Sequence, residues 1–156
     1  MKREQGFTLV ELIVAMAIVA LLGSGGWWSM ARWQQQQRLW QGAQALRQFL
    51  QYQRERAEAG NLTLQITAER PASGWRLRAN PIGLMHKPDN ERLHSLRLKA
   101  GDIELLDITD RLAFYGGRNT AWPGHITIGN GSGRWRVVIS AWGRIRLCRP
   151  EEGRCQ

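Results

Sequence analysis

The chain has 156 residues, of which 43% are hydrophobic and 22% are charged, and it contains 17 glycines and 5 prolines. These values are typical of one ordinary globular domain and argue against collagen, a coiled coil or a wholly disordered chain. Lysine and arginine total 22 against 13 acidic residues, which gives a net charge of +9. Such a charge favours an anionic partner, whether lipid, nucleic acid or acidic protein, without selecting among them.

An apolar segment dominates the N-terminal region. It runs from Phe7 to Leu22, interrupted only by Thr8 and Glu11, and continues through a Gly/Ser-rich stretch to Ala31. About 25 helical residues at roughly 1.5 Å each can cross a hydrocarbon core of about 30 Å. Basic residues precede the segment and tryptophans lie near its far end, namely Lys2, Arg3, Trp27 and Trp28. This order predicts a membrane-spanning helix with its basic end in the cytoplasm and all later residues outside the cytoplasm.

A secretory signal peptide is the alternative reading of the same segment. Ser29-Met30-Ala31 is a passable small-residue cleavage site, and cleavage there would release a conventional soluble periplasmic protein starting at Arg32. Glu11 argues against this, since a carboxylate near the centre of an apolar helix costs about 2.5 to 3.5 kcal/mol and usually serves a purpose. The bulky tryptophans just before the site are also atypical of a cleavage region.

Residues 2–13, Lys-Arg-Glu-Gln-Gly-Phe-Thr-Leu-Val-Glu-Leu-Ile, resemble the N-terminus of type IV prepilins and type II secretion pseudopilins. The pattern combines a short basic leader, Gly6 before the cleavage point, Phe7 after it, and Glu11 a few residues into the mature chain. The resemblance implies that a prepilin peptidase cleaves between Gly6 and Phe7 and methylates the new amino terminus. The apolar helix would then be retained.

The same resemblance implies a role for Glu11 in assembly. In pilin-like assemblies the corresponding carboxylate meets the α-amino group of a neighbouring subunit, which would give this charge a partner in an apolar environment. The implied partners are the peptidase and other minor and major pilin-like subunits. Removing Lys2, Arg3 and Glu4 would lower the side-chain charge from +9 to +8, so the basic character belongs mainly to the exported part.

An amphipathic helix follows the apolar segment. Its apolar residues recur at helical spacing, namely Leu39, Ala43, Leu46, Leu50 and Ala57. Gly60-Asn61 predicts its end. A helix from Phe7 to about Ala59 would be roughly 80 Å long. Glycines 23, 25 and 26 each cost about 1 kcal/mol relative to alanine, and they predict a bend or local unwinding in its middle.

Beyond Leu62 the apolar pattern changes to period two, which predicts half-buried strands. The expected strands are 62–66, 75–79, 93–98, 103–108, 126–128, 135–139 and 145–147. Residues 80–90 read as a loop, and Asn130-Gly131-Ser132-Gly133 as a hairpin turn. One helix followed by strands predicts an α+β fold in which the second half of the helix packs on an antiparallel sheet.

Two C-terminal segments extend the resemblance. Residues 114–126 and 138–148 are similar to the C-terminal half of H-type (GspH/FimT-like) minor pilins and pseudopilins. The resemblance implies a pilin-like fold with four parts: a leader at 1–6, a membrane and assembly helix at 7–31, an amphipathic helix at 32–60, and a β-rich exported domain at 61–156.

The two cysteines, Cys148 and Cys155, lie close together near the C-terminus. Neither belongs to a CxxC pair or has a nearby histidine, so the spacing does not suggest a metal or redox site. A disulfide in an oxidising compartment is the simplest role. In the chain-entropy model, closing so short a loop contributes about 2.5 kcal/mol.

Arginines are concentrated in the last two expected strands. Arg134 and Arg136 would point to the same face of one strand, as would Arg144 and Arg146 on the next, so a hairpin could present these guanidinium groups together, with Arg149 following. Some FimT-like pilins associated with DNA uptake carry a similar Gly-Arg-x-Arg stretch, so the resemblance implies possible DNA binding by these five arginines. The alternative is the solvated face of a sheet whose other face holds apolar residues.

No catalytic or metal-binding pattern is evident. His86, His94 and His125 are spread over loop and strand contexts, and the acidic residues follow no calcium-loop spacing. We therefore expect no enzyme activity, cofactor or metal. The expected function is a minor pilin-like structural subunit that primes or caps a type IV pilus or type II secretion pseudopilus, anchored in the bacterial inner membrane with a periplasmic domain.

Overall fold

The computed structural model describes residues 8–83, 94–99, 101–153 and 155, without the side chains of 23–29 and 99. The chain divides into two compact units, Met1–Gln34 and Gln35–Gln156, which are described separately. Among the described residues are one long helix, nine strands and two short 3₁₀ helices. The α+β class predicted from the sequence is confirmed.

The helix α1 (Leu9–Gly60) has a defined cap at each end. At its start, the Glu11 amide donates to the Thr8 carbonyl at 3.0 Å and to Thr8 Oγ1 at 3.4 Å, so Thr8 is the N-cap residue. At its end, Asn61 adopts a left-handed conformation with φ 50°. The amide of Leu62 donates to the Ala57 carbonyl at 2.9 Å and that of Asn61 to Glu58 at 3.3 Å, the pair of bonds of a Schellman motif.

The predicted local unwinding at the glycines is wrong, because α1 is helical throughout residues 23–26, whereas the predicted bend stays a prediction. A glycine weakens a helix through the entropy of the unfolded chain, but it keeps its amide and carbonyl, so the hydrogen-bond ladder can continue. The predicted helix end at Gly60-Asn61 is confirmed. The predicted first helical residue, Phe7, lies outside the described residues.

The first unit presents its apolar side chains on every side of the helix, and the large ones from Leu9 to Leu22 are exposed. Among the side chains that the structure describes, no helical stretch meets the length and hydropathy expected of a membrane span. The span predicted for residues 7–31 includes Phe7 and side chains 23–29, which are outside that description. It stays a prediction.

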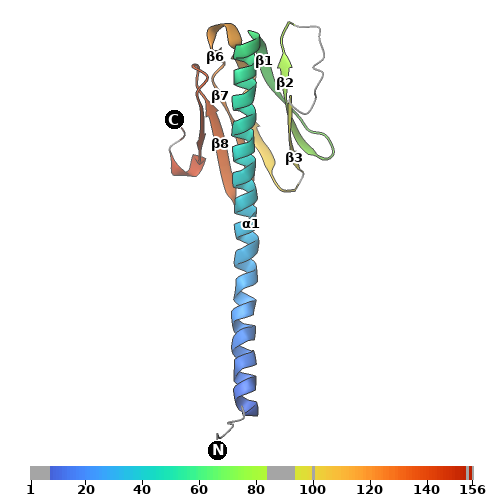
Figure 1. The fold of residues 1–156 in the computed structure, drawn as a ribbon, viewed down its shortest axis with the longest axis vertical. Helices are drawn as coiled ribbons and strands as arrows, with labels where there is room; N and C mark the ends of the chain where they lie inside the picture. The colour runs from blue at the N-terminus through green and yellow to red at the C-terminus, as the bar shows by residue number, and fades with distance from the viewer. Residues whose placement is uncertain (1–7, 84–93, 100, 154, 156) are drawn as a thin grey trace, which may run out of the picture. The chain divides into compact units, whose positions relative to one another are not determined.

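The second unit contains two antiparallel sheets. The first has the order β3-β2-β1-β5-β6, with strands β1 (Thr63–Glu69), β2 (Gly74–Pro81), β3 (Ser95–Lys99), β5 (Ala113–Tyr115) and β6 (Thr120–Ala121). The second has the order β4-β7-β8-β9, with β4 (Glu104–Ile108), β7 (Gly124–Asn130), β8 (Gly133–Ile139) and β9 (Ile145–Cys148). In this unit, β1 to β3 lie on one side of α1 and β7 and β8 on the other (Figure 1).

The core lies between the helix and both sheets. The helical residues picked out by their spacing are all buried, from Leu39 at 2% exposure to Leu50 at 0%. They meet the inward side chains of both sheets, including Leu64, Leu77, Ile128 and Val137, in a continuous apolar cluster. Burial at about 25 cal/mol per Å² makes this cluster the main stabilising feature of the second unit.

All seven predicted strands are present, but they form two sheets where the sequence predicted one. Two strands were missed, β5 and β6, which have three and two residues and are too short to display a period of two. The loop predicted from Asn80 begins later, because Asn80 and Pro81 complete β2. Its residues from 84 lie outside the described part. The Asn130–Gly133 hairpin is confirmed between β7 and β8.

Candidate functional site

Glu11 lies in the first turn of α1 in the first unit. Ala15 and Val19 follow it at intervals of four along one line of the helix, beside Leu12 and Met16. The carboxylate is exposed among exposed apolar side chains. Thr8 Oγ1 accepts the Glu11 backbone N–H, and the Glu11 carboxylate makes no hydrogen bond or ion pair with any described residue. Gly6 and Phe7, the predicted processing residues, are outside the described residues.

In the β8–β9 hairpin the arginines of β8 lie on one face and the core residues lie on the opposite face. Val137 and Ile139 of β8 are buried, and Trp135 contacts Trp40 of α1 with ring centroids 4.7 Å apart. Because side chains alternate along a strand, Arg134 and Arg136 point away from α1. We call this surface of the second sheet the outer face.

β9 adds arginines to the outer face. Arg146 pairs with Val138, and Cys148 pairs with Arg136, so Arg136 and Arg146 are diagonal neighbours. Arg144 lies just before β9, and both Arg144 and Arg146 are exposed. The geometry therefore places Arg134, Arg136, Arg144 and Arg146 on one surface.

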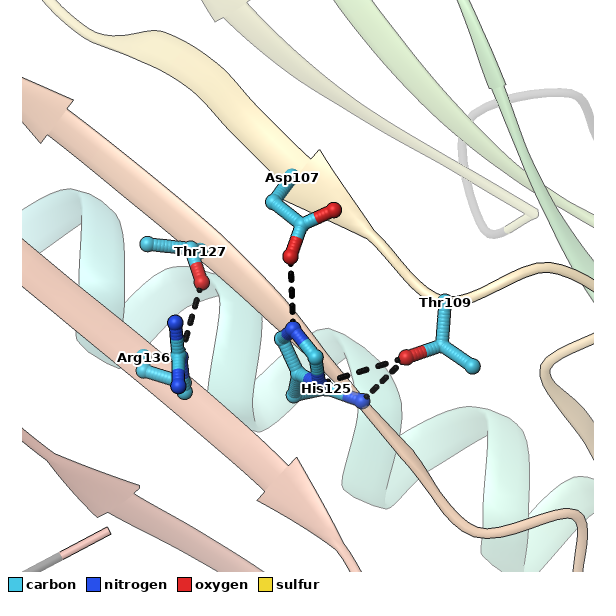
Figure 2. A network of polar contacts seen from close by, with 5 residues as sticks. All are labelled: Asp107, Thr109, His125, Thr127 and Arg136. Atoms are coloured by element: carbon cyan, nitrogen blue, oxygen red, sulfur yellow. Dashed lines mark hydrogen bonds and ion pairs between the residues drawn. The ribbon is translucent and has the colours of Figure 1, made fainter. Parts of the chain in front are cut away.

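Arg136 is partly engaged by its own sheet. Its Nε donates to Oγ1 of the buried Thr127 on β7 at 3.0 Å (Figure 2). The hydrogen bond uses one of the five guanidinium N–H groups and leaves the others for a partner. This hydrogen bond holds the Arg136 side chain against its own sheet.

Figure 2 also shows a carboxylate–imidazole pair on the same sheet. Asp107 Oδ2 lies 2.6 Å from His125 Nε2, and Thr109 Oγ1 lies 3.3 Å from His125 Nδ1. The Thr109 oxygen also accepts the His125 backbone N–H at 2.9 Å. The network spans β4 and β7 where their register shifts between Leu105 and Asp107. It holds the end of β4 to the sheet, and its carboxylate lowers the positive charge at this end of the outer face.

The pairing of Asp107 with His125 was missed in the sequence because the residues are 18 positions apart and follow no known motif. Only the register of β4 on β7 brings them together. His94 lies elsewhere, with Nδ1 2.5 Å from Nη1 of Arg56. Burial and the nearby Arg56 charge lower the pKa of His94 below its ordinary value of 6.5. His86 is outside the described residues.

Arg149 departs from the predicted arginine group. Its guanidinium stacks over the ring of Trp135 at 4.7 Å and its Nη1 lies 3.2 Å from Glu152 Oε1. Trp135 belongs to the face that meets α1, so Arg149 does not join the outer face. The reason is that β9 ends at Cys148, and strand alternation no longer applies beyond it.

Cys148 and Cys155 form a disulfide with Cα atoms 5.5 Å apart. It closes the tail that contains the 3₁₀ helix η2 (Pro150–Glu152) back onto the end of β9. The bridge therefore fixes Arg149 and Glu152 beside the sheet.

Two exposed tryptophans lie in the segments that follow β6 and β8. Trp142 is 80% exposed in the turn that joins β8 to β9, two residues before Arg144. Trp122, which follows β6, is 46% exposed. The backbone amide of Ala121 donates to the Ala141 carbonyl at 2.9 Å, which brings the two tryptophan-bearing segments together.

The comparisons with known proteins bear on both units. Residues 1–27 match the prokaryotic N-terminal methylation motif. The fold matches the minor pseudopilin EpsH from the type 2 secretion system of Vibrio cholerae, with a TM-score of 0.54 and 20% identity, over 72% of this chain and 98% of that one. No curated protein sequence matches the chain. The chain thus carries the prokaryotic N-terminal methylation motif and shares the fold of the minor pseudopilin EpsH, in agreement with the sequence resemblance.

Proposed function

We propose that this protein is a minor pilin-like structural subunit that primes or caps a type IV pilus or a type II secretion pseudopilus. The observation that carries the proposal is the presence in one chain of the methylation motif at residues 1–27 and a helix-and-two-sheet domain with the EpsH fold. In this proposal the protein binds neighbouring subunits and catalyses no reaction.

The first unit supplies the assembly element. Its helix exposes apolar side chains on all sides, which is favourable only in lipid or against other apolar helices. We propose that a prepilin peptidase cleaves after Gly6, that Phe7 becomes the methylated N-terminus, and that residues 7–31 anchor the subunit in the inner membrane. The second unit, closed by its disulfide, would then lie in the periplasm.

Processing is tested by the N-terminal residue and mass of the mature protein from cells with active and with inactivated prepilin peptidase. The expected product begins at methylated Phe7 only when the peptidase is active. Gly6→Val should block cleavage, whereas Ala31→Leu should change nothing. A chain that begins at Arg32 and depends on Ala31 would instead establish the conventional periplasmic protein.

The role proposed for Glu11 is tested with Glu11→Val. The substitution removes the charge and keeps the helix apolar, so membrane insertion should persist while recovery of the subunit in sheared filaments or in cross-linked complexes falls at least tenfold. Thr8→Val is the matched control for the cap, since it weakens the helix start and retains the carboxylate. Normal assembly of Glu11→Val would refute the role.

DNA binding is a second candidate, supported by exposed Trp142 beside exposed Arg144 and Arg146. Guanidinium groups bind phosphates, and an exposed aromatic ring can stack on a base. The full chain in a non-ionic detergent should bind a DNA duplex with steep salt dependence. Arg144→Gln with Arg146→Gln should abolish binding, whereas the control pair Arg97→Gln with Arg118→Gln, also exposed arginines, should retain it. If both double substitutions reduced DNA binding equally, the binding would be due to net charge and not to Arg144 and Arg146.

A further inference from the structure

The free edge of the second sheet borders a groove that the pilin-like role does not use. In the part of the chain that the structure describes, β9 is the last strand in the order β4-β7-β8-β9, and no described strand pairs with its other edge. Beside it lies a groove of about 600 Å³ against α1, whose lining includes Trp40, Arg47, Trp135 and the whole of β9. This volume is within the range of about 300 to 1,000 Å³ that ligand sites occupy.

The backbone of β9 offers both donors and acceptors to the groove. The Ser140 amide donates to the Arg144 carbonyl at 3.0 Å and the Arg144 amide donates to Ser140 Oγ at 3.2 Å, so Arg144 directs its backbone groups toward β8. Hydrogen-bonded and non-bonded pairs alternate along an antiparallel ladder. Arg146 and Cys148 are therefore bonded to β8, and Ile145 and Leu147 direct their N–H and C=O groups to the free edge. This alternation is the template for adding one more strand.

The charge around this edge is strongly positive. Four arginines line the groove against one acidic side chain, and that residue, Glu152, already pairs with Arg149 at 3.2 Å. The four are Arg47, Arg144, Arg146 and Arg149. A second copy of this basic chain would meet like charges here, whereas an acidic segment would be attracted.

Arg47 provides an independent indication of a missing partner. It projects from α1 into the groove lining, and its Nε is buried and makes no hydrogen bond to any described residue. A buried donor without an acceptor is unfavourable, so an incoming carboxylate or carbonyl that satisfied it would bind more tightly for that reason. The tilted pair of Trp40 and Trp135 provides an apolar surface beside it.

The unpaired strand edge, the positive charge and the unsatisfied Arg47 donor all point to one kind of ligand. We propose that the groove beside β9 binds an extended acidic segment of a partner protein by strand addition. The segment hydrogen-bonds to Ile145 and Leu147 and directs its carboxylates to the side of the strand that faces α1, where Arg47 lies. The free strand edge favours a peptide over DNA, because its carbonyl acceptors match peptide N–H groups and repel phosphate. The proposal does not depend on processing of the N-terminus or on Glu11.

The test uses the full chain in non-ionic detergent and a blocked hexapeptide of alternating Glu and Val, with binding measured by calorimetry and NMR. The expected result is saturable binding at least tenfold tighter than that of the Lys-Val counterpart. Two further peptides are N-methylated at every Glu or at every Val. Since an added strand uses only one of its edges, one of these should lose binding and the other should keep it.

Arg47→Gln should weaken binding at least fivefold, while the control Arg134→Gln removes one exposed arginine outside the groove and should change it less than twofold. Absence of binding at millimolar peptide, equal binding of the Lys-Val peptide, or indifference to both N-methylation patterns would overturn the proposal. So would a thymidine 12-mer that occupies the groove with Arg47-dependent affinity in place of the peptide.

Discussion

Gly116 begins the 3₁₀ helix η1 (Gly116–Arg118) and lies against the end of α1. A Cβ placed on Gly116 would be 1.8 Å from the Ala57 carbonyl oxygen, whereas one on Gly117 would be 2.6 Å from the Asn61 side-chain oxygen. The first contact is with helix backbone and the second with the tip of a movable side chain. Gly116→Ala should therefore displace the end of α1 from η1 and destabilise the fold, whereas Gly117→Ala should be tolerated.

The magnitude follows from the contacts that must change. The Ala57 carbonyl accepts the Leu62 amide at 2.9 Å, and the Gly116 amide donates to the Leu62 carbonyl at 3.0 Å. Weakening both bonds costs about 1 kcal/mol each. Overpacking adds about 1 to 3 kcal/mol, and the lower entropy of unfolded alanine returns about 0.4 to 1 kcal/mol. The net loss for Gly116→Ala is about 3 kcal/mol.

Urea unfolding of the full chain in detergent, followed by tryptophan fluorescence, measures this loss. Gly116→Ala should lower the free energy of unfolding by about 3 kcal/mol, or the Tm by about 12 °C for a unit of this size. Gly117→Ala should stay within about 1 kcal/mol of the original protein. Equal effects of the two substitutions, or a loss below about 1 kcal/mol at Gly116, would refute the packing of η1 against α1.

Two further predictions concern the tail and His94. Replacing both Cys148 and Cys155 by Ser should reduce the free energy of unfolding by about 2.5 kcal/mol, and dithiothreitol should cause the same loss in the original protein but none in the variant. For His94, the lowered pKa means that the unfolded chain binds more protons near pH 6, so stability should fall as the pH drops through 6.5 and level off below the folded-state pKa. His94→Gln should flatten this decline in urea midpoints measured between pH 7.5 and 5, and an unchanged decline would exclude His94 as its source.

Sequence periodicity was sufficient for the elements that are long enough to repeat. The apolar spacing from Leu39 to Ala57 identified the buried side of α1, and period two identified seven strands. Periodicity could not assign strands to sheets, because β1 pairs with β5 across nearly fifty intervening positions and no local pattern encodes that pairing. Long-range contacts determine which strands pair, as they determine the pairing of Asp107 with His125.

The arginines show where the alternation of side chains along a strand stops being predictive. Alternation placed Arg134, Arg136 and Arg146 correctly relative to the core, because each lies within a regular strand. Arg149 lies one residue beyond β9, where the disulfide-closed tail turns it over Trp135. A signal for the cap at Thr8 was present in the sequence, since Thr8 and Glu11 have the spacing of a capping box, but the adjoining apolar run obscured the helix start.

The two units have opposite relations to their surroundings. The second unit buries its apolar side chains internally, whereas the first leaves those from Leu9 to Leu22 uncovered. In the proposed assembly these side chains pass from lipid to neighbouring helices, which are about equally apolar, so the transfer itself contributes little free energy. The direction of assembly then depends on polar interactions, and Glu11 is the one carboxylate among these residues. This is why Glu11→Val should affect assembly far more than insertion.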